Sequence, residues 1–434
     1  MQKQRNRCVL NYFLIGLILS CSPCAFAQRG RVESGTVNSP GLARNLFNDP
    51  PTRPFKVYLP PSYDSSATRY PVVYALHGWP GNQDSLLGDI QSYLDSNLRQ
   101  RKVGEMIIVF VNGTSRLGGG PWYLSSEVVG DFEGYITKDL VDLIDSRYRT
   151  LATRESRGLH GFSIGAWGAM HLALKFPERF SAVVAESGLY DSRSKDNDNY
   201  ERLLALAHPT NLTQFNALLG QNPPISASLQ AFFCGILPNP NRPSLYSDYV
   251  YEWTNGAAVF NPSAAQRCLQ GDVQNGDLGR YILQPTRLTA IKIIHGTGDG
   301  IISIAEARAF TNALTTSGIS FDYHEHSGGH DHLPGLSLPF LSTNLSGAQL
   351  LLTAPKLTVQ IETNSTRISF VTQPTVEYVV QSTASLSGGW VDQAILPGSG
   401  VTATSTLPRS ASSQQFFRVE ARPVSRASLS RDGP

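Results

Sequence analysis

A serine near the middle of the chain is placed as a nucleophile would be. Ser163 is the central residue of Gly161-Phe162-Ser163-Ile164-Gly165, which fits the pattern Gly-x-Ser-x-Gly. This pattern occurs at a sharp turn from a strand to a helix, where glycines leave room for the close approach of the two elements. A serine held on such a turn indicates acyl transfer through a covalent intermediate.

A nucleophilic serine needs a general base and an acid that orients the base, and the chain offers both in the order serine, acid, histidine. Asp299 comes just after an apolar run, and His330 follows a pair of glycines. The separation of 31 residues (330 − 299) fits one helix and one strand. We therefore predict a triad of Ser163, Asp299 and His330, with His332 as the alternative base.

The oxyanion of a tetrahedral intermediate needs two N–H donors. We expect one from the backbone of Ile164, directly after the serine, and the other from Trp79 in the turn 76–81, with Gly78 as the alternative. His77, in the same turn, is expected to anchor the loop by hydrogen bonds.

Two interpretations stay open for Trp122 and Tyr123, which follow a glycine triplet. Both side chains could line the acyl or aromatic part of a substrate cleft. They could equally be an aromatic pair packed beneath a loop.

The elements that must position these residues alternate between strands and helices. Nearly continuous apolar runs predict strands buried on both faces of a mostly parallel sheet; they are residues 70–78, 106–113, 181–188 and 290–296. Alternating segments at 55–61 and 319–326 also predict strands, and helices are expected over 134–145, 164–175 and 304–317. This alternation predicts an α/β fold with helices on both faces of the sheet.

Two parts of the chain depart from this pattern. Residues 190–288 are rich in Asn, Pro, Tyr and Ser, and we expect them to form an insertion over the carboxyl-terminal edge of the sheet, where ligands bind. Short alternating segments at 357–361, 367–370, 378–382 and 416–420 predict a small all-β module. The expected domains are thus an α/β domain over 28–345 and a β module over 346–421, with an unstructured tail over 422–434.

The first 27 residues are predicted to be a secretory signal peptide. They contain three basic residues, an apolar stretch over 9–19 and Ala25-Phe26-Ala27, so cleavage is expected after Ala27 and the protein would be secreted or periplasmic. Lipidation of Cys21 is the alternative. The apolar stretch is too short for a permanent membrane span. The remainder carries 33 Lys and Arg (36 − 3) against 34 Asp and Glu, a balance that does not favour nucleic acid or an anionic membrane surface as partner.

Of the five cysteines, only Cys234 and Cys268 follow the expected signal peptide. In an oxidising compartment a disulfide between them is predicted, with two separate buried thiols as the alternative. The spacing of Cys and His resembles no zinc site. No metal and no organic cofactor is expected.

Together these residues resemble the α/β-hydrolase esterases of the esterase D and feruloyl or acetylxylan esterase group, which includes the mycolyltransferases. The similarity lies in residues 55–63, 70–81, 122–123, 132–150, 161–180, 295–299 and 328–330. It implies an α/β-hydrolase fold, the triad above and a serine carboxylesterase.

Export and the appended module favour an ester carried on a polymer, such as feruloyl or acetyl groups on plant polysaccharide. The alternatives are a siderophore-ester hydrolase, an acyltransferase, and a non-catalytic protein that binds carbohydrate or a surface.

Overall fold

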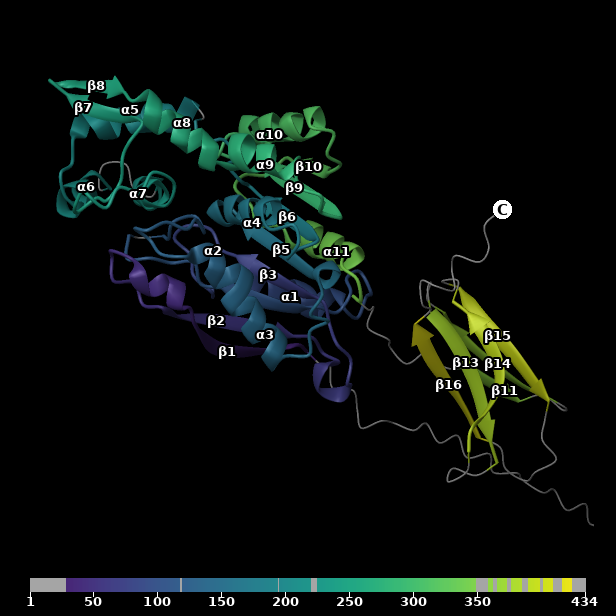
Figure 1. Cartoon of the computed structure of the whole chain (residues 1–434). Coiled ribbons are helices and arrows are strands. Elements are labelled where there is room, and N and C mark those ends of the chain that lie inside the picture. Colours follow the sequence, from purple (N-terminus) through teal and green to yellow (C-terminus); the bar gives the residue numbers. More distant parts are fainter. Residues whose placement is uncertain are drawn as a thin grey trace, which may run out of the picture. The chain divides into compact units, whose positions relative to one another are not determined.

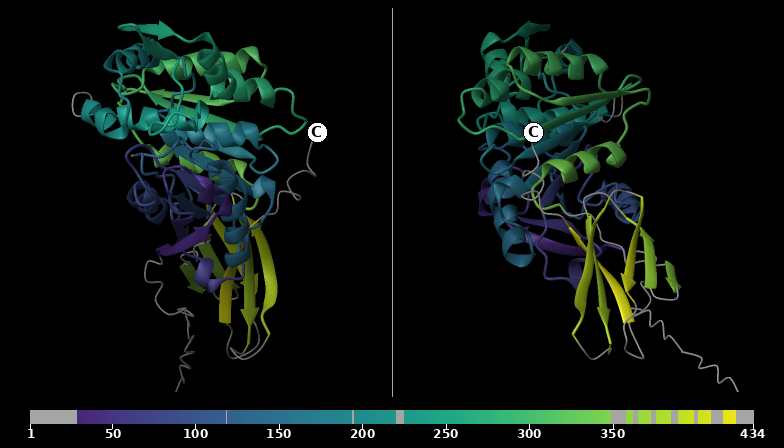
Figure 2. Two further views of the ribbon diagram at one scale, coloured as in Figure 1. Left: turned by 60° about the vertical axis from the view of Figure 1, so that its left-hand side comes forward. Right: turned by 90° about the vertical axis from the view of Figure 1, so that its right-hand side faces the viewer.

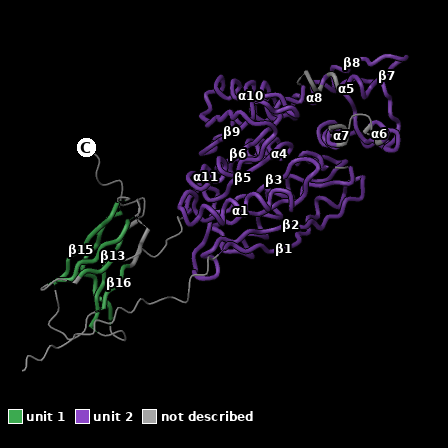
Figure 3. Tube along the Cα trace, turned by 180° about the vertical axis from the view of Figure 1, so that it is seen from behind, with its two compact units in different colours: residues 1–28, 351–434 green, residues 29–350 purple. Residues whose placement is uncertain are grey.

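The computed structural model divides into two compact units, residues 29–350 and a second unit whose described residues lie within 358–423 (Figure 3). The sequence predicts this boundary after residue 345. The structure describes residues 29–117, 119–193, 195–219, 225–348, 358–361, 365–372, 376–384, 389–398, 401–408 and 416–423. The predicted signal peptide, 1–27, and residues 424–434 of the predicted tail lie outside the described residues.

An eight-stranded sheet forms the centre of the larger unit (Figure 1). Its order is β1-β2-β4-β3-β5-β6-β9-β10, and β2 alone runs in the opposite direction to the other seven strands. The strands are β1 (Arg31–Asn38), β2 (Thr52–Leu59), β3 (Val72–Leu76), β4 (Ile107–Val111), β5 (Arg157–Phe162), β6 (Ala182–Glu186), β9 (Ala290–Gly296) and β10 (Asp322–His326). The predicted α/β architecture with a mostly parallel sheet is confirmed.

Helices shield the central strands from solvent. Every residue of β3, β4 and β6 is buried, as expected of apolar strands covered on both faces. The helices of this layer are α1 (Leu87–Asn97), α2 (Phe132–Gly134), the π-helical segment η3 (Tyr135–Leu140), α3 (Val141–Arg147), α4 (Ile164–Lys175), α10 (Ile304–Thr316) and α11 (Pro334–Asn344). α4 packs on β5 and β6, and α1 contacts α11.

Strand β1 was missed by the sequence pattern because it lies at the edge of the sheet. Only one of its eight residues, Val37, is buried, so its sequence lacks the apolar repeat of a covered strand. Short 3-10 turns complete the unit: η1 (Pro40–Arg44), η2 (Tyr63–Ser65) and η4 (Arg154–Ser156).

The segment between β6 and β9, predicted as an insertion, is mainly helical. It contains α5 (Lys195–Ala207), α6 (Leu212–Leu219), α7 (Ile225–Ile236), the hairpin β7 (Tyr251–Thr254) and β8 (Ala257–Phe260), α8 (Pro262–Gly271), the π-helical η5 (Val273–Asp277) and α9 (Leu278–Tyr281). Phe232 of α7 packs edge-on against Trp167 of α4, with ring centroids 5.2 Å apart. The insertion therefore shares the core of the larger unit.

The C-terminal unit is all-β, as predicted, with two layers visible in Figure 2. One sheet has the order β11-β12-β15 and the other β14-β13-β16. The strands are β11 (Thr358–Ile361), β12 (Ser365–Val371), β13 (Val376–Thr383), β14 (Val391–Pro397), β15 (Thr402–Pro408) and β16 (Phe416–Pro423). Side chains from both sheets, among them Ile368, Phe370 and Tyr378, form one core.

Within the described ranges, no helix combines the length and apolar character that crossing a membrane requires.

Candidate active site

Ser163 lies on the turn between β5 and α4 with a strained backbone. Its φ of 58° and ψ of −122° are uncommon for a residue other than glycine. The flanking glycines explain how the turn is tolerated. A Cβ at Gly161 would lie 2.0 Å from the carbonyl oxygen of Gly165, and one at Gly165 would lie 2.1 Å from that of Leu76. The Gly-x-Ser-x-Gly pattern is thus a steric requirement of this strand-turn-helix junction.

Asp299 and His330 follow the adjacent parallel strands β9 and β10 and form a hydrogen bond. His330 Nδ1 lies 2.8 Å from Asp299 Oδ2. The other carboxylate oxygen, Oδ1, accepts the backbone N–H groups of Ile301 and Ile302 at 2.8 and 2.9 Å. An imidazole that donates from Nδ1 carries its lone pair on Nε2, the arrangement a general base needs.

The loops that carry these two residues are tied together by their backbones. Gly298 N–H donates to the carbonyl of Gly328 at 2.9 Å, and Thr297 N–H donates to that of His326 at 2.7 Å. A Cβ at Gly296 would lie 2.1 Å from the carbonyl oxygen of Gly329. The glycines on both loops therefore permit the approach that brings Asp299 to His330.

The predicted base, His330, lies next to the turn that carries Ser163. The His330 ring is 5.0 Å, centroid to centroid, from the ring of Phe162, the residue before Ser163. Asp299 and His330 follow the carboxyl ends of β9 and β10, and Ser163 follows Phe162 at the carboxyl end of β5. Because these strands are parallel and close in the sheet, the three predicted triad residues lie at one edge of it.

The turn predicted to supply an oxyanion donor lies against the nucleophile. A Cβ at Gly78 would be 2.9 Å from Ser163 Cβ, so the backbone just before Trp79 reaches the serine. Ile164 begins α4, and the first N–H groups of a helix have no partner within it. Both predicted donors, Trp79 and Ile164, thus lie on segments that adjoin Ser163.

His77 anchors the turn 76–81 by hydrogen bonds, as expected. Gly113 N–H donates to its Nε2 at 3.0 Å, and its Nδ1 lies 2.9 Å from the carbonyl oxygen of Gly78. Burial lowers the pKa of His77 to about 4, so the ring is neutral at pH 7 and donates through Nδ1. The turn is therefore held from both sides by one imidazole.

Trp122 and Tyr123 are core residues rather than the walls of an open cleft. Trp122 packs against Trp167 and Phe232 and donates from Nε1 to the Ser228 hydroxyl at 2.7 Å. Tyr123 is 1% exposed, and its hydroxyl donates to the carbonyl of His77 at 2.9 Å. The interpretation as packed aromatic side chains beneath a loop is the one the structure supports.

The predicted disulfide is absent: Cys234 and Cys268 are free, buried thiols. They lie on different helices, α7 and α8, in separate environments. Cys234 Sγ donates to the carbonyl of Leu245 at 3.2 Å, while Cys268 has Ser192 beside it. Burial raises the pKa of each thiol to about 12. This corrects the sequence expectation, which had no means of placing the two sulfurs relative to each other.

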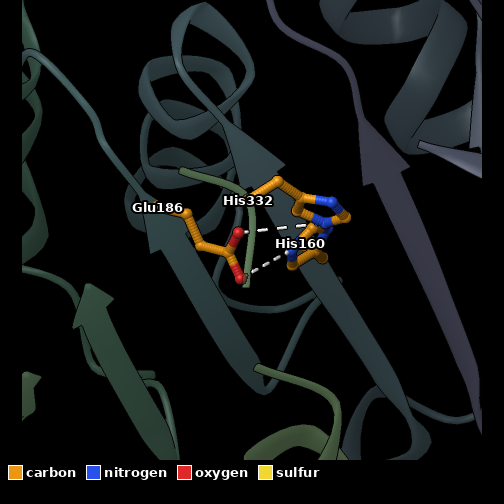
Figure 4. A group of neighbouring side chains, drawn as sticks. All are labelled: His160, Glu186 and His332. Atoms are coloured by element: carbon orange, nitrogen blue, oxygen red, sulfur yellow. Dashed lines mark ion pairs between the residues drawn. The ribbon is translucent and has the colours of Figure 1, made fainter. Parts of the chain in front are cut away.

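A buried cluster of His160, Glu186 and His332 was not predicted (Figure 4). His160 lies in β5, Glu186 ends β6, and His332 follows His330 by two residues. In sequence, Glu186 and His332 are 146 residues apart (332 − 186), so no local spacing relates them. The only signal was the occurrence of a histidine and a glutamate inside otherwise apolar strands.

The chain is similar to known esterases. A family model described as "Putative esterase" matches residues 50–333. Uncharacterized protein YbbA of Bacillus subtilis is 30% identical over 148 residues, which are 32% of this chain and 57% of YbbA. An endo-1,4-beta-xylanase/feruloyl esterase of Xylanibacter ruminicola is 29% identical over 133 residues, 29% of this chain and 18% of that protein. The matched segments thus span 57% of the length of the first relative and 18% of the length of the second.

Among solved structures, an S-formylglutathione hydrolase from Agrobacterium tumefaciens is 18% identical, with a TM-score of 0.47. The alignment covers 74% of this chain and 97% of that one.

Proposed function

Since this chain belongs to the putative esterase family of α/β-hydrolase fold, we propose that it is a serine carboxylesterase whose triad is Ser163, His330 and Asp299. The observation that carries the proposal is the 2.8 Å hydrogen bond between His330 and Asp299, beside a serine with positive φ. A structural role alone would not require a strained serine next to an oriented imidazole.

The reaction proceeds in two halves. In the first, Ser163 Oγ attacks the ester carbonyl, Nε2 of His330 takes the serine proton and then gives it to the leaving alkoxide. Asp299 holds the imidazole in the required tautomer and stabilises its charged form. The N–H groups of Ile164 and Trp79 bind the oxyanion. In the second half, His330 takes a proton from water as the water attacks the acyl carbon. The bond from that carbon to Ser163 Oγ breaks, His330 returns the proton to Oγ, and the carboxylic acid is released.

For the substrate, we propose an ester on plant polysaccharide, either feruloyl or acetyl. The xylanase/feruloyl esterase among the relatives supports this choice, because its name joins the ester with a polysaccharide. We also propose that residues 1–27 direct export, since basic residues precede an apolar stretch and Ala25-Phe26-Ala27. An exported enzyme would reach insoluble polymer, which a cytosolic one would not.

The nucleophile is tested by Ser163→Ala with a fluorophosphonate probe. We expect wild-type protein to be labelled and to hydrolyse p-nitrophenyl acetate, and the variant to lose both properties, with turnover reduced about 10⁴- to 10⁶-fold. Ser187→Ala is a matched control, because Ser187 also has a positive φ, 51°, at the end of a strand but lies outside the triad. Labelling of Ser163→Ala at the wild-type rate would refute the assignment.

The substrate class is tested by comparing methyl ferulate, acetylated xylan and p-nitrophenyl acetate as substrates. We expect one of the first two to give the highest kcat/KM. A preference for the simple p-nitrophenyl ester, with neither plant ester hydrolysed, would refute the substrate while leaving the triad in place.

A further inference from the structure

Three buried side chains converge behind the nucleophile turn: His160, Glu186 and His332. Figure 4 shows both imidazole rings directed at the one carboxylate. His160 Nε2 lies 3.2 Å from Glu186 Oε1, and His332 Nε2 lies 3.8 Å from Glu186 Oε2. All three ligand-type atoms lie within 4.8 Å of one another. His160 and Glu186 are fully buried, and the side chain of His332 is 7% exposed.

The atoms that face one another in this cluster lack hydrogen bonds. Within the described part of the chain, His160 Nε2, Glu186 Oε1 and His332 Nε2 have no hydrogen-bond partner, although the first two are close. Burying such groups without partners is costly. Each of these three atoms can donate a lone pair, and all three lie close together. A single bound ion could therefore coordinate all of them.

The donor set and its spacing match a metal ion. Two imidazole nitrogens and one carboxylate oxygen are ligands that zinc prefers, and its bonds of about 2.0 to 2.2 Å place tetrahedral ligands roughly 3.4 Å apart. The 3.2 Å between His160 Nε2 and Glu186 Oε1 is close to that value, and His332 Nε2 lies 3.8 Å from the other oxygen, Oε2, of the same carboxylate.

The surroundings of His332 and Glu186 match as well. His332 Nδ1 lies 3.4 Å from Asp89 Oδ2, the outer carboxylate that commonly orients a zinc-bound histidine. Leu333 N–H donates to Glu186 Oε2 at 2.9 Å, which holds the carboxylate in place. We propose that His160, Glu186 and His332 bind one divalent metal ion, such as Zn²⁺.

Such an ion would hold together the segments that carry Ser163 and His330, and it would take no part in the reaction. His160 precedes Ser163 by three residues, and the carbonyl of Glu186 accepts the N–H of Ser163 at 2.9 Å. His332 follows His330 by two residues. One ion would therefore join the segments that carry nucleophile and base. The inference does not rest on the proposed esterase activity, because it is drawn from the cluster alone.

Metal content tests the proposal directly. Full-length protein is purified without chelator, dialysed and analysed by elemental mass spectrometry; chelated protein is then titrated with Zn²⁺ and Co²⁺. We expect about one ion per chain, a visible absorption band on Co²⁺ binding, and a melting temperature that rises when the ion is restored. Protein that retains no ion, and binds neither probe at micromolar concentrations, would overturn the proposal and leave a buried His–Glu pair.

Variants locate the ion. Glu186→Gln and His332→Gln should abolish stoichiometric binding, and Asp89→Asn, a surface change on α1, should weaken Zn²⁺ binding ten- to hundredfold without a folding defect. The control is His208→Gln, because His208 lies outside the cluster and stacks on Trp253, with ring centroids 4.5 Å apart. Its variant should keep one ion. Unchanged binding in His332→Gln and Asp89→Asn would show that the ion lies elsewhere, which also contradicts the proposal.

Discussion

Four groups contact the side chain of Asp299. Because these contacts fix its orientation, the oxygen that faces His330 should matter to activity. One carboxylate oxygen faces His330 and lies 3.4 Å from His295 Nε2, and the other accepts two backbone N–H groups. These contacts leave the carboxylate little freedom to rotate. The orientation of His330 thus depends on the identity of Oδ2.

Asp299→Asn should therefore lower turnover on p-nitrophenyl acetate by about 10⁴-fold, because an amide can stabilise the wrong imidazole tautomer and cannot stabilise imidazolium. Asp322→Asn is the matched control: this aspartate starts β10 and pairs with Lys292 at 2.6 Å, away from the triad. Near-normal kcat in Asp299→Asn would show that His330 is not oriented by this residue.

At the scale of elements, the close contact of β3 with the start of α4 sets the nucleophile turn. A Cβ at Gly165 would meet the carbonyls of Leu76 and His77 at 2.1 and 2.7 Å, and neither backbone can move without displacing the sheet. Gly165→Ala should lower the free energy of unfolding by about 1 to 3 kcal/mol or more, measured by urea denaturation.

Gly88→Ala supplies the control for that experiment. Gly88 lies in α1, and nothing stands within 4 Å of the position of its Cβ. Alanine favours helix, so this variant should raise the free energy of unfolding by up to about 1 kcal/mol. If the two substitutions had equal effects, steric contact at the turn would not be the cause.

A second link between elements is electrostatic. His171 of α4 lies between Asp277 of η5 at 2.6 Å and Glu133 of α2 at 3.0 Å, and Lys175 and Arg280 contact these carboxylates. Burial by itself would lower the pKa of His171, but Asp277 and Glu133 outweigh it and raise the pKa from 6.5 to about 9. The imidazolium thus joins three elements at neutral pH.

Because the folded pKa is raised, this stabilisation is fully present below pH 6.5 and is lost as pH rises through about 9. His171→Gln should cost about 3 to 5 kcal/mol near pH 6.5, measured by urea denaturation, and the difference from wild type should shrink by pH 10. A difference that stays constant from pH 6.5 to 10 would mean that His171 is not charged in the folded protein.

At the scale of the whole molecule, every residue assigned to the reaction belongs to the unit 29–350. A chain truncated after residue 348 should therefore hydrolyse p-nitrophenyl acetate at close to the full-length rate. The β module should matter only for polymer, through local concentration on an insoluble surface. Truncated protein that shows native circular dichroism but has lost most activity on the small ester would show that the module completes the active site.

The sequence by itself determined most strands of the central sheet and the segments that carry the proposed triad, but not the helices α1 and α11 or the elements between β6 and β9. The turn at Ser163, the helix 164–175 and the buried strands were all predicted, because glycine sterics and apolar periodicity are properties of neighbouring residues. Strand β1 was missed because an exposed edge strand has no such period.

Only the tertiary structure decided which distant side chains meet. It buried Trp122 and Tyr123 in the core, kept Cys234 and Cys268 as separate thiols, and brought His160, Glu186 and His332 together. In β5 and β6, Phe162 pairs with Glu186, so strand register rather than sequence spacing carries Glu186 to the nucleophile turn. Such contacts depend on how strands align and loops close, and no local pattern of residue types records that alignment.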